Sequence, residues 1–124
     1  GSVACVFHKR NEDVMRQITT RVLGVSNHNT DGTSRQHILT KYAHSGGAVI
    51  LNHVSSLEGD PNTIEVLLPG AEGKKPRRVG FLPGRVGDKL ARYIDAQREV
   101  TAVISAVETV EKPPHTSLEL KITF

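Results

Sequence analysis

The sequence predicts a small α+β domain, mainly β with two helices, folded as an SH3-like or OB-like β-barrel of about six strands. Short runs rich in β-branched residues are separated by Gly, Pro, Asn and Asp, which is typical of strands joined by turns. Two other segments have apolar residues at helical spacing. Because strands and helices do not alternate regularly, the pattern argues against a βαβ sheet.

The first half of the chain predicts one strand and one helix. The strand covers residues 18–26 and ends in the polar run 26–32. A helix of about three turns follows, because Thr33 and Gln36 fit a capping box and an apolar stripe comes next. The stripe consists of Ile38, Leu39, Tyr42 and Ala43. We expect these side chains to face the core.

The remaining elements are expected from the same two patterns. Further strands are expected at residues 48–54, 63–68, 78–82, 100–110 and 117–124. A second helix near residues 85–96 would turn its apolar side inward and its basic side outward. The inward residues are Val86, Leu90, Tyr93 and Ile94, and the outward ones are Arg85, Lys89 and Arg92.

The length of 124 residues is suited to one domain with a modest core. Gly1-Ser2 is typical of the remnant left when a tag is cut off, so we expect an N-terminal arm over 1–20, partly artificial, and one domain over 21–124. A single Cys5 excludes an intrachain disulfide, and the longest apolar run, Val3–Phe7, is too short for a membrane span. We expect no membrane association and a cytoplasmic protein, or a nuclear one in a eukaryote.

The positive charge is concentrated in one stretch of the chain. The whole chain has a formal net charge of +3, whereas residues 74–92 contain seven basic residues and one acidic residue, Asp88, and therefore carry +6. The basic residues are Lys74, Lys75, Arg77, Arg78, Arg85, Lys89 and Arg92. Such asymmetry favours polyanions at one surface. A solvated loop and helix face is the simpler alternative.

Catalytic and metal-binding motifs are weak in this sequence. The six histidines form no pair at metal-ligand spacing, and Cys5 has no second cysteine to share an ion. Asp60 with Glu65, or with Glu119, imitates the carboxylates of a metal-dependent nuclease, but alternating acidic residues on strands produce such matches often. We therefore expect no catalytic residues, no metal and no cofactor.

Three short motifs occur in an order that resembles the HIRAN domain, a module found alone in bacteria and at the front of DNA-remodelling helicases. They are Val22-Leu23-Gly24-Val25, Asp60-Pro61-Asn62-Thr63-Ile64 and Val79-Gly80-Phe81-Leu82-Pro83. The resemblance covers residues 21–124 and depends on the co-occurrence of the motifs, because none is diagnostic alone. It implies a small barrel that binds a single-stranded DNA end with a free 3′-hydroxyl and catalyses no reaction.

The resemblance also implies roles for individual residues. Asp60 would accept a hydrogen bond from the 3′-hydroxyl, which suits a carboxylate because it repels a terminal phosphate. The family's Arg and aromatic residues after the first strand are replaced here by Ser26, Asn27 and His28. The aromatic residue that often precedes the Asp in the family is replaced here by Gly59. Since stacking on aromatics contributes affinity for single strands, these departures weaken the expected end recognition.

The sequence therefore predicts a non-enzymatic module that binds single-stranded DNA or DNA 3′ ends. The predicted site residues are Ser26, Asn27, His28, Asp60, Asn62, Lys74, Lys75, Arg77, Arg78, Phe81, Arg85 and Lys89. Phe81 is expected to be partly exposed near the basic residues. The first alternative is a protein-interaction or targeting module beside the helicase or nuclease domains of a larger DNA-processing protein, and a metal-dependent nuclease is a remote one.

Overall fold

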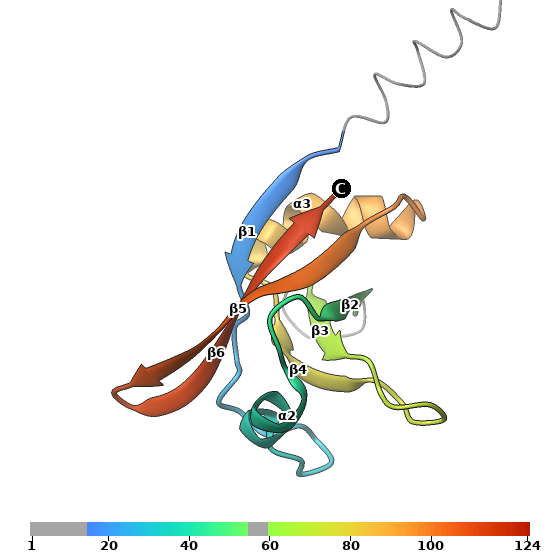
Figure 1. The fold of residues 1–124 in the computed structure, drawn as a ribbon. Helices are drawn as coiled ribbons and strands as arrows, with labels where there is room; N and C mark the ends of the chain where they lie inside the picture. Colours follow the sequence, from blue (N-terminus) through green and yellow to red (C-terminus); the bar gives the residue numbers. More distant parts are fainter. Residues whose placement is uncertain (1–14, 55–59) are drawn as a thin grey trace, which may run out of the picture.

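The computed structural model describes residues 15–54 and 60–124. Within these residues lie six strands and two helices (Figure 1). The strands are β1 (Gln17–Arg21), β2 (Ala48–His53), β3 (Ile64–Leu68), β4 (Arg77–Phe81), β5 (Thr101–Glu111) and β6 (Pro114–Thr123). The helices are α2 (Arg35–Tyr42) and α3 (Gly84–Asp95). Cys5, Val3–Phe7 and Gly59 lie outside the described residues. The described sheet begins at Gln17, inside the range 1–20 that was expected to form an N-terminal arm.

The strands form one antiparallel sheet in the order β1-β6-β5-β2-β3-β4. The sheet curls into a half-barrel of the small OB-like α+β type, so the predicted fold class is confirmed. Its two ends meet just beyond β1, where Leu23 N–H donates to Phe81 O at 2.8 Å and Phe81 N–H donates to Leu23 O at 2.9 Å. A Cβ at Gly80 would lie 2.4 Å from Leu23 O. This close approach of two backbones requires glycine.

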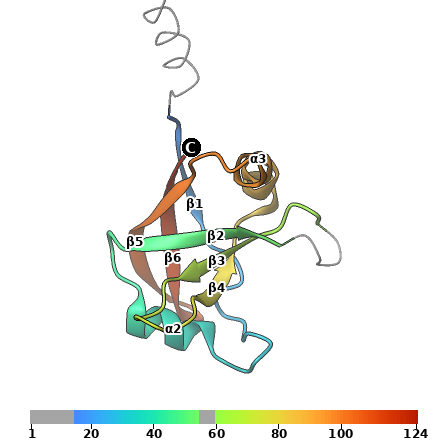
Figure 2. The same cartoon turned by 90° about the vertical axis from the view of Figure 1, so that its right-hand side faces the viewer.

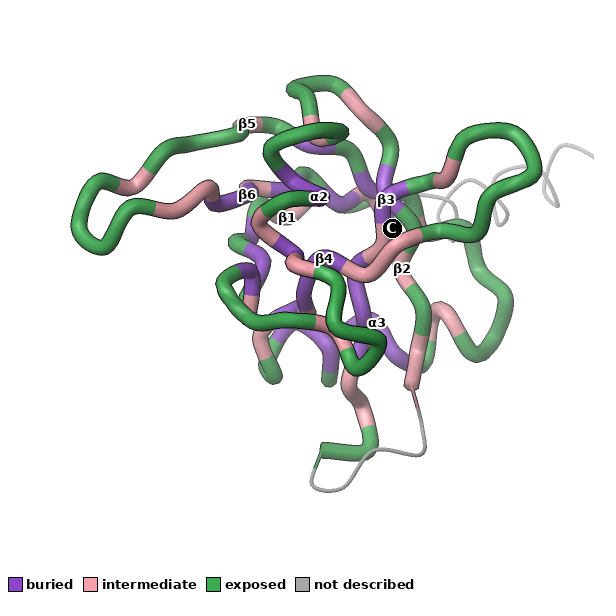
Figure 3. Tube along the Cα trace, turned by 90° about the horizontal axis from the view of Figure 1, so that it is seen from below, coloured by how far each residue is buried: buried purple, intermediate pink, exposed green. Residues whose placement is uncertain are grey.

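The core fills the inside of the curled sheet, where Figure 3 shows the buried positions gathered together. Its fully buried side chains are Leu39, Ile64, Val66, Val79, Leu90, Ile104, Leu118, Leu120 and Ile122. In β3 and β6 these residues recur at alternate positions, and in β5 the buried Ala102 and Ile104 do the same, as expected where one strand face packs on the core. The helices lie at opposite ends of the half-barrel (Figure 2).

The outer half of the β5–β6 hairpin extends away from the barrel (Figure 1). Among the described strands, β1 pairs with β6 at 119–123 and β2 pairs with β5 at 102–103, so residues 106–117 have strand partners only within the β5–β6 hairpin. We refer to residues 106–117 as the arm. The sequence placed the start of the last strand at residue 117, whereas β6 begins at Pro114.

The start of the sheet also differs from the sequence expectation. A strand was expected over 18–26, but β1 ends at Arg21. Gly24 has a φ of +75°, a conformation that turns the chain out of the extended direction and that suits glycine. Between the end of β1 at Arg21 and the start of α2 at Arg35, the chain forms only isolated bridges, between Leu23 and Phe81 and between His28 and Ser34.

The helix α2 begins one residue later than its capping signal suggested. Ser34 is the N-cap, and its side chain accepts a hydrogen bond from His37 N–H. The two residues of the expected capping box have other partners, since the Thr33 hydroxyl donates to the nearby Asp31 Oδ1 at 2.7 Å and Gln36 contacts β6. The helix α3 agrees with its predicted range, and its predicted faces are confirmed.

Candidate nucleic-acid interface

A groove of about 700 Å³ separates the β3–β4 hairpin from α2 and the loop before it. One wall comes from the hairpin and includes Glu65, Lys74, Lys75, Arg77 and Arg78. The opposite wall includes Asn29, Asp31, Ser34, His37 and Tyr42. We call this the hairpin groove. It brings together four of the predicted basic residues, which are close in sequence, and faces them with polar side chains from an earlier segment.

The hairpin loop holds Lys74 and Lys75 at the edge of this groove. The loop is tightly folded, because Lys74 N–H donates to Ala71 O at 2.7 Å and a Cβ at Gly70 would lie 2.5 Å from Lys74 O. Gly73 has a φ of +78°, which closes the turn. Both lysine side chains are exposed, and neither has a hydrogen bond or ion pair within the described part of the chain. Their ammonium groups are therefore available to an anion.

Arg77 is held against an aromatic ring on the other wall. Its guanidinium carbon lies 4.5 Å from the centroid of the Tyr42 ring, and Lys41 Nζ lies 5.4 Å from the same centroid. Hydrogen bonding with Arg77 lowers the pKa of the Tyr42 hydroxyl. The prediction that Tyr42 faces the core is wrong, since 42% of the residue is exposed. The last turn of α2 faces the cationic hairpin, while Ile38 and Leu39 in the middle of the helix are buried.

Arg78 has a structural partner. Its Nη2 donates to Glu65 Oε2 at 3.1 Å, and the two side chains are 26% and 11% exposed. Removing one member of so shielded a pair leaves the other charge poorly compensated. The guanidinium also lies 5.1 Å from the Phe81 ring centroid. Arg78 therefore forms part of the groove wall, whereas the sequence suggested a solvent-facing cation.

Sequence reasoning missed a buried arginine, Arg35, behind this wall. Only 5% of the residue is exposed. Its Nε donates to Asn29 Oδ1 at 2.8 Å, its Nη1 donates to Gly24 O at 2.8 Å, and its guanidinium lies 5.2 Å from the Phe81 ring centroid. Burial, with the nearby charge of Arg78, lowers its pKa. An arginine in the first turn of a helix is normally expected to be solvent-exposed, so the sequence pattern gave no sign that Arg35 is buried.

Phe81 lies between these two arginines and is half-buried, in agreement with the expectation of partial exposure. Arg35 and Arg78 together carry two positive charges, while Glu65 supplies one negative charge to the cluster. Asn29 ties the cluster to the loop, because its Nδ2 donates to Arg78 O at 2.9 Å. The excess positive charge lies behind a groove whose edge is already basic. The local potential therefore favours an anion.

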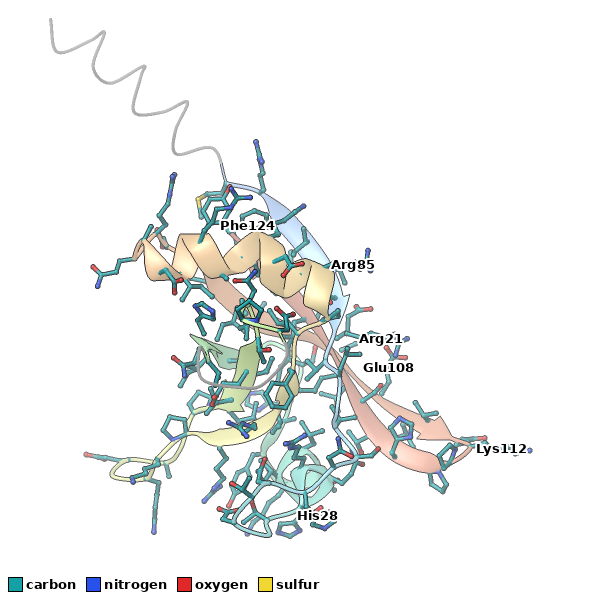
Figure 4. All side chains as sticks on the ribbon, turned by 180° about the vertical axis from the view of Figure 1, so that it is seen from behind. Arg21, His28, Arg85, Glu108, Lys112 and Phe124 are labelled. Atoms are coloured by element: carbon teal, nitrogen blue, oxygen red, sulfur yellow. The ribbon has the colours of Figure 1, made fainter. Side chains whose placement is uncertain are left out.

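Four further predicted site residues, Ser26, Asn27, His28 and Asp60, do not line a common cavity within the described part of the chain. The first three residues are exposed in the turn after β1, at the α2 end of the molecule where Figure 4 labels His28. Asp60 lies beside the start of α3, since a Cβ at Gly84 would be 3.6 Å from its Oδ2. Neither of the two described cavities is lined by any of these four residues. Their joint role stays a prediction.

Asp60 and Asn62 stabilise the turn that leads into β3. Asn62 N–H donates to Asp60 Oδ1 at 2.8 Å, and Asn62 Nδ2 donates to Asp88 Oδ1 at 3.1 Å. Asn62 O approaches α3 so closely that a Cβ at Gly87 would lie 2.5 Å from it. Asp60 is nevertheless exposed, and its Oδ2 is directed toward α3. The turn predicted from the Asp-Pro sequence is confirmed, and one carboxylate oxygen remains an available acceptor.

The basic stretch does not form one continuous face. Arg85 lines a separate cavity of about 430 Å³ with Arg21 and Glu119, and Figure 4 shows Arg21 and Arg85 on the same side of the molecule. Lys89 is exposed on α3. The strand β4 carries the chain from one end of the barrel toward the other. The basic residues of the β3–β4 hairpin and those of α3, although close in sequence, therefore lie apart in the structure. The hairpin groove gathers only the first four of them.

Within residues 15–54 and 60–124, no group of three or more His, Cys, Asp and Glu side chains is placed to hold a metal ion. No helix in the same residues is long and apolar enough to cross a membrane.

The geometry defines a small OB-like half-barrel with a basic groove at one end. No family model matches the sequence, and a search of curated proteins returns no significant match. Among solved structures, the chain is similar to the HIRAN domain of human HLTF, with a TM-score of 0.60 and 17% identity over 87% of this chain and 74% of that one. A structural genomics protein from Lactobacillus plantarum matches with a TM-score of 0.62 and 18% identity over 89% of this chain and 98% of that one. The fold is therefore HIRAN-like.

Proposed function

We propose that this chain is a DNA-binding module that catalyses no reaction and binds single-stranded DNA or DNA 3′ ends. The observation that carries the proposal is the hairpin groove, in which Lys74 and Lys75 have no partner among the described residues and lie at the edge of a cavity backed by further arginines. Phosphates are the natural partners of such cations, and backbone contacts of this kind do not depend on base sequence. The HIRAN-like fold agrees with this function.

Charge reversal at the two lysines tests the groove directly. Lys74→Glu with Lys75→Glu replaces two attractive charges by two repulsive ones at exposed positions, so the fold should persist and binding of a labelled single strand should be abolished at moderate salt. Fluorescence anisotropy across a salt series gives the affinity. For the wild-type protein, log affinity should fall against log salt by roughly 0.7 per phosphate neutralised on a single strand.

The matched control is Lys112→Glu at the tip of the arm, which Figure 4 places far from the groove. It changes the net charge without touching the groove and should leave the affinity close to that of the wild-type protein. Equal affinities for the wild-type protein and the double variant would contradict the proposal. A clear loss of affinity in Lys112→Glu, which changes the net charge by half as much as the double variant, would show a dependence on net charge.

Recognition of a 3′-hydroxyl is the finer part of the proposal. It is supported by the exposed Asp60, whose Oδ2 is not used in the turn hydrogen bond to Asn62. A carboxylate accepts a hydrogen bond from a hydroxyl and repels a phosphate. The wild-type protein should therefore prefer a strand ending in a 3′-hydroxyl to one ending in a 3′-phosphate, and Asp60→Asn should lose the preference. Equal affinity for both ends in the wild-type protein would remove Asp60 from the site.

A protein-interaction or targeting module is the second candidate, and the arm favours it. Val107 is 38% exposed there, and the arm's strands pair only with one another among the described strands. Unpaired strand edges accept a further strand from a partner. In that case the isolated chain should show no salt-dependent DNA affinity, and Val107→Asp should abolish capture of a partner that survives nuclease treatment. Incubation of labelled DNA with the protein and magnesium or manganese tests the nuclease alternative, because a binding module leaves the strand intact whereas a nuclease cleaves it.

A further inference from the structure

An exposed aromatic ring lies in the hairpin groove, at a position that the sequence pattern assigned to the core. Of the tyrosine and phenylalanine side chains that the structure describes, only Tyr42 is exposed. Building on the proposed function, we propose that Tyr42 and Arg77 form a stacking platform for one unpaired base, whose flanking phosphates bind Lys74 and Lys75. The groove would thereby select single strands over duplexes.

The platform is held rigidly from both sides. Tyr42 is the last residue of α2, and the turn below it is anchored by buried Ile38 and Leu39 and closed by Ala43 N–H donating to Leu39 O at 3.0 Å. Arg77 begins β4, whose backbone pairs with β3. Neither side chain depends on a flexible loop for its position. Because the two side chains are already held in place, stacking of a base there costs little conformational entropy of the protein.

The chemistry of the pair suits a nucleobase. The Arg77 guanidinium lies over the Tyr42 ring at 4.5 Å, which is a cation–π contact. A guanidinium is planar, and bases stack both on aromatic rings and on arginine planes. A base can therefore stack on the exposed Tyr42 ring or on the guanidinium plane beside it. Phe81 offers no equivalent surface, since its ring is half-buried whereas Tyr42 is exposed.

The selection for single strands follows from the geometry of stacking. In a duplex both faces of a base are covered by its neighbours, so no face is free for the platform unless the base is unstacked at a cost in free energy. In a single strand a base can turn into the groove while the backbone follows the cationic edge. The lysines supply affinity for any phosphate backbone, and the platform discriminates between strand types.

Two strands of equal length separate these contributions. One is an ordinary short single strand, and the other is an abasic strand that keeps the phosphates and lacks the bases. Tyr42→Leu removes the ring with a good helix former at an exposed position, and Arg77→Lys keeps the charge but removes the plane. Both should weaken binding of the ordinary strand by roughly five- to 150-fold, the loss expected for one stacked base, and leave binding of the abasic strand unchanged. Tyr42→Phe should retain the wild-type affinity.

Val103→Ala on β5, at an exposed valine that lines neither described cavity, is the control for removal of an exposed apolar side chain, and thermal unfolding shows whether each variant folds. Unchanged affinity of Tyr42→Leu for the ordinary strand, or an equal loss on both strands, would overturn the platform. In either case, loss of binding in the Lys74→Glu, Lys75→Glu variant would leave the proposed function standing. Failure of the wild-type protein to bind either strand would overturn both proposals.

Discussion

At the scale of single residues, His53 shows how one side chain joins three segments. Its Nδ1 lies 2.7 Å from Asp95 Oδ1 at the end of α3, and its Nε2 lies 2.7 Å from Pro61 O in the turn after Asp60. Both partners are acceptors, so both ring nitrogens must donate, which only the charged imidazolium can do. The hydrogen bond to Asp95, followed by that to Pro61, raises the pKa of His53 above its ordinary value of 6.5.

This raised pKa makes the stability of the protein depend on pH. The unfolded state binds the proton with the ordinary pKa, so the stabilisation from His53 is fully present below 6.5 and is lost as pH rises through the higher pKa of the folded state. We expect the midpoint of urea unfolding to fall as pH rises above about 6.5. Asp95→Asn removes the carboxylate while keeping an acceptor, and should flatten this dependence. Parallel pH profiles for the two proteins would contradict the assignment to His53.

Two other residues show where sequence reasoning fails at this scale. Tyr42 has the spacing of a core residue and Arg35 has the chemistry of a surface residue, yet Tyr42 is exposed and Arg35 is buried. Periodicity identifies the face of a helix, but it does not identify what covers that face. Part of the cover over α2 comes from β4, which is distant in sequence, and this arrangement could not be predicted.

At the scale of elements, the arm is attached to the barrel through Gln36. The side-chain amide donates to Val25 O at 2.9 Å and to Thr116 O at 2.8 Å, and its Oε1 accepts from Thr116 N–H at 2.6 Å. The amide thus occupies both backbone groups of Thr116, as a neighbouring strand would. It protects a sheet edge that has no strand partner at this position among the described strands.

Removal of this contact should loosen the arm before it unfolds the barrel. Gln36→Ala should cost about 1 kcal/mol, because the groups it leaves are only part-buried and water can reach them. Gln36→Glu should cost more, since a carboxylate cannot donate and would oppose two carbonyl oxygens. Urea unfolding gives the free energy, and hydrogen exchange at the Thr116 amide reports the local opening. Gln17→Ala, at an exposed glutamine of β1, is the control. Equal stability of Gln36→Ala and Gln17→Ala would contradict this role.

The strands were the more predictable elements. Alternation and turn residues located β2, β3, β4 and β5 to within a residue or so, because a strand with one buried face must alternate. The bounds of the first and last strands differ from the prediction. The positive φ of Gly24 ends the extended run early, and pairing within the arm extends β6 back to Pro114. The capping signal of α2 failed because both of its side chains found partners elsewhere.

At the scale of the whole molecule, the closure of the half-barrel decides which residues meet. The bridge between Leu23 and Phe81 brings the Gly24 turn against β4, and Arg35 and Asn29 then fill the space beside Phe81. The sequence motifs around Gly24 and Gly80 indicated a HIRAN-like barrel, and the fold agrees. The separation of the basic stretch into a groove and a second cavity could not be predicted, because it depends on the path of the chain through β4 and α3.

The central claim is that DNA enters the hairpin groove, and NMR spectroscopy tests it most directly. Two-dimensional ¹H–¹⁵N spectra of the labelled protein are recorded during titration with a short single strand that has a free 3′-hydroxyl. We expect the largest shifts at the backbone amides of Asn29, Tyr42, Lys74 and Arg77, with the arm unaffected. Shifts confined to the arm or to the Arg21–Arg85 cavity, or the absence of shifts, would contradict the claim.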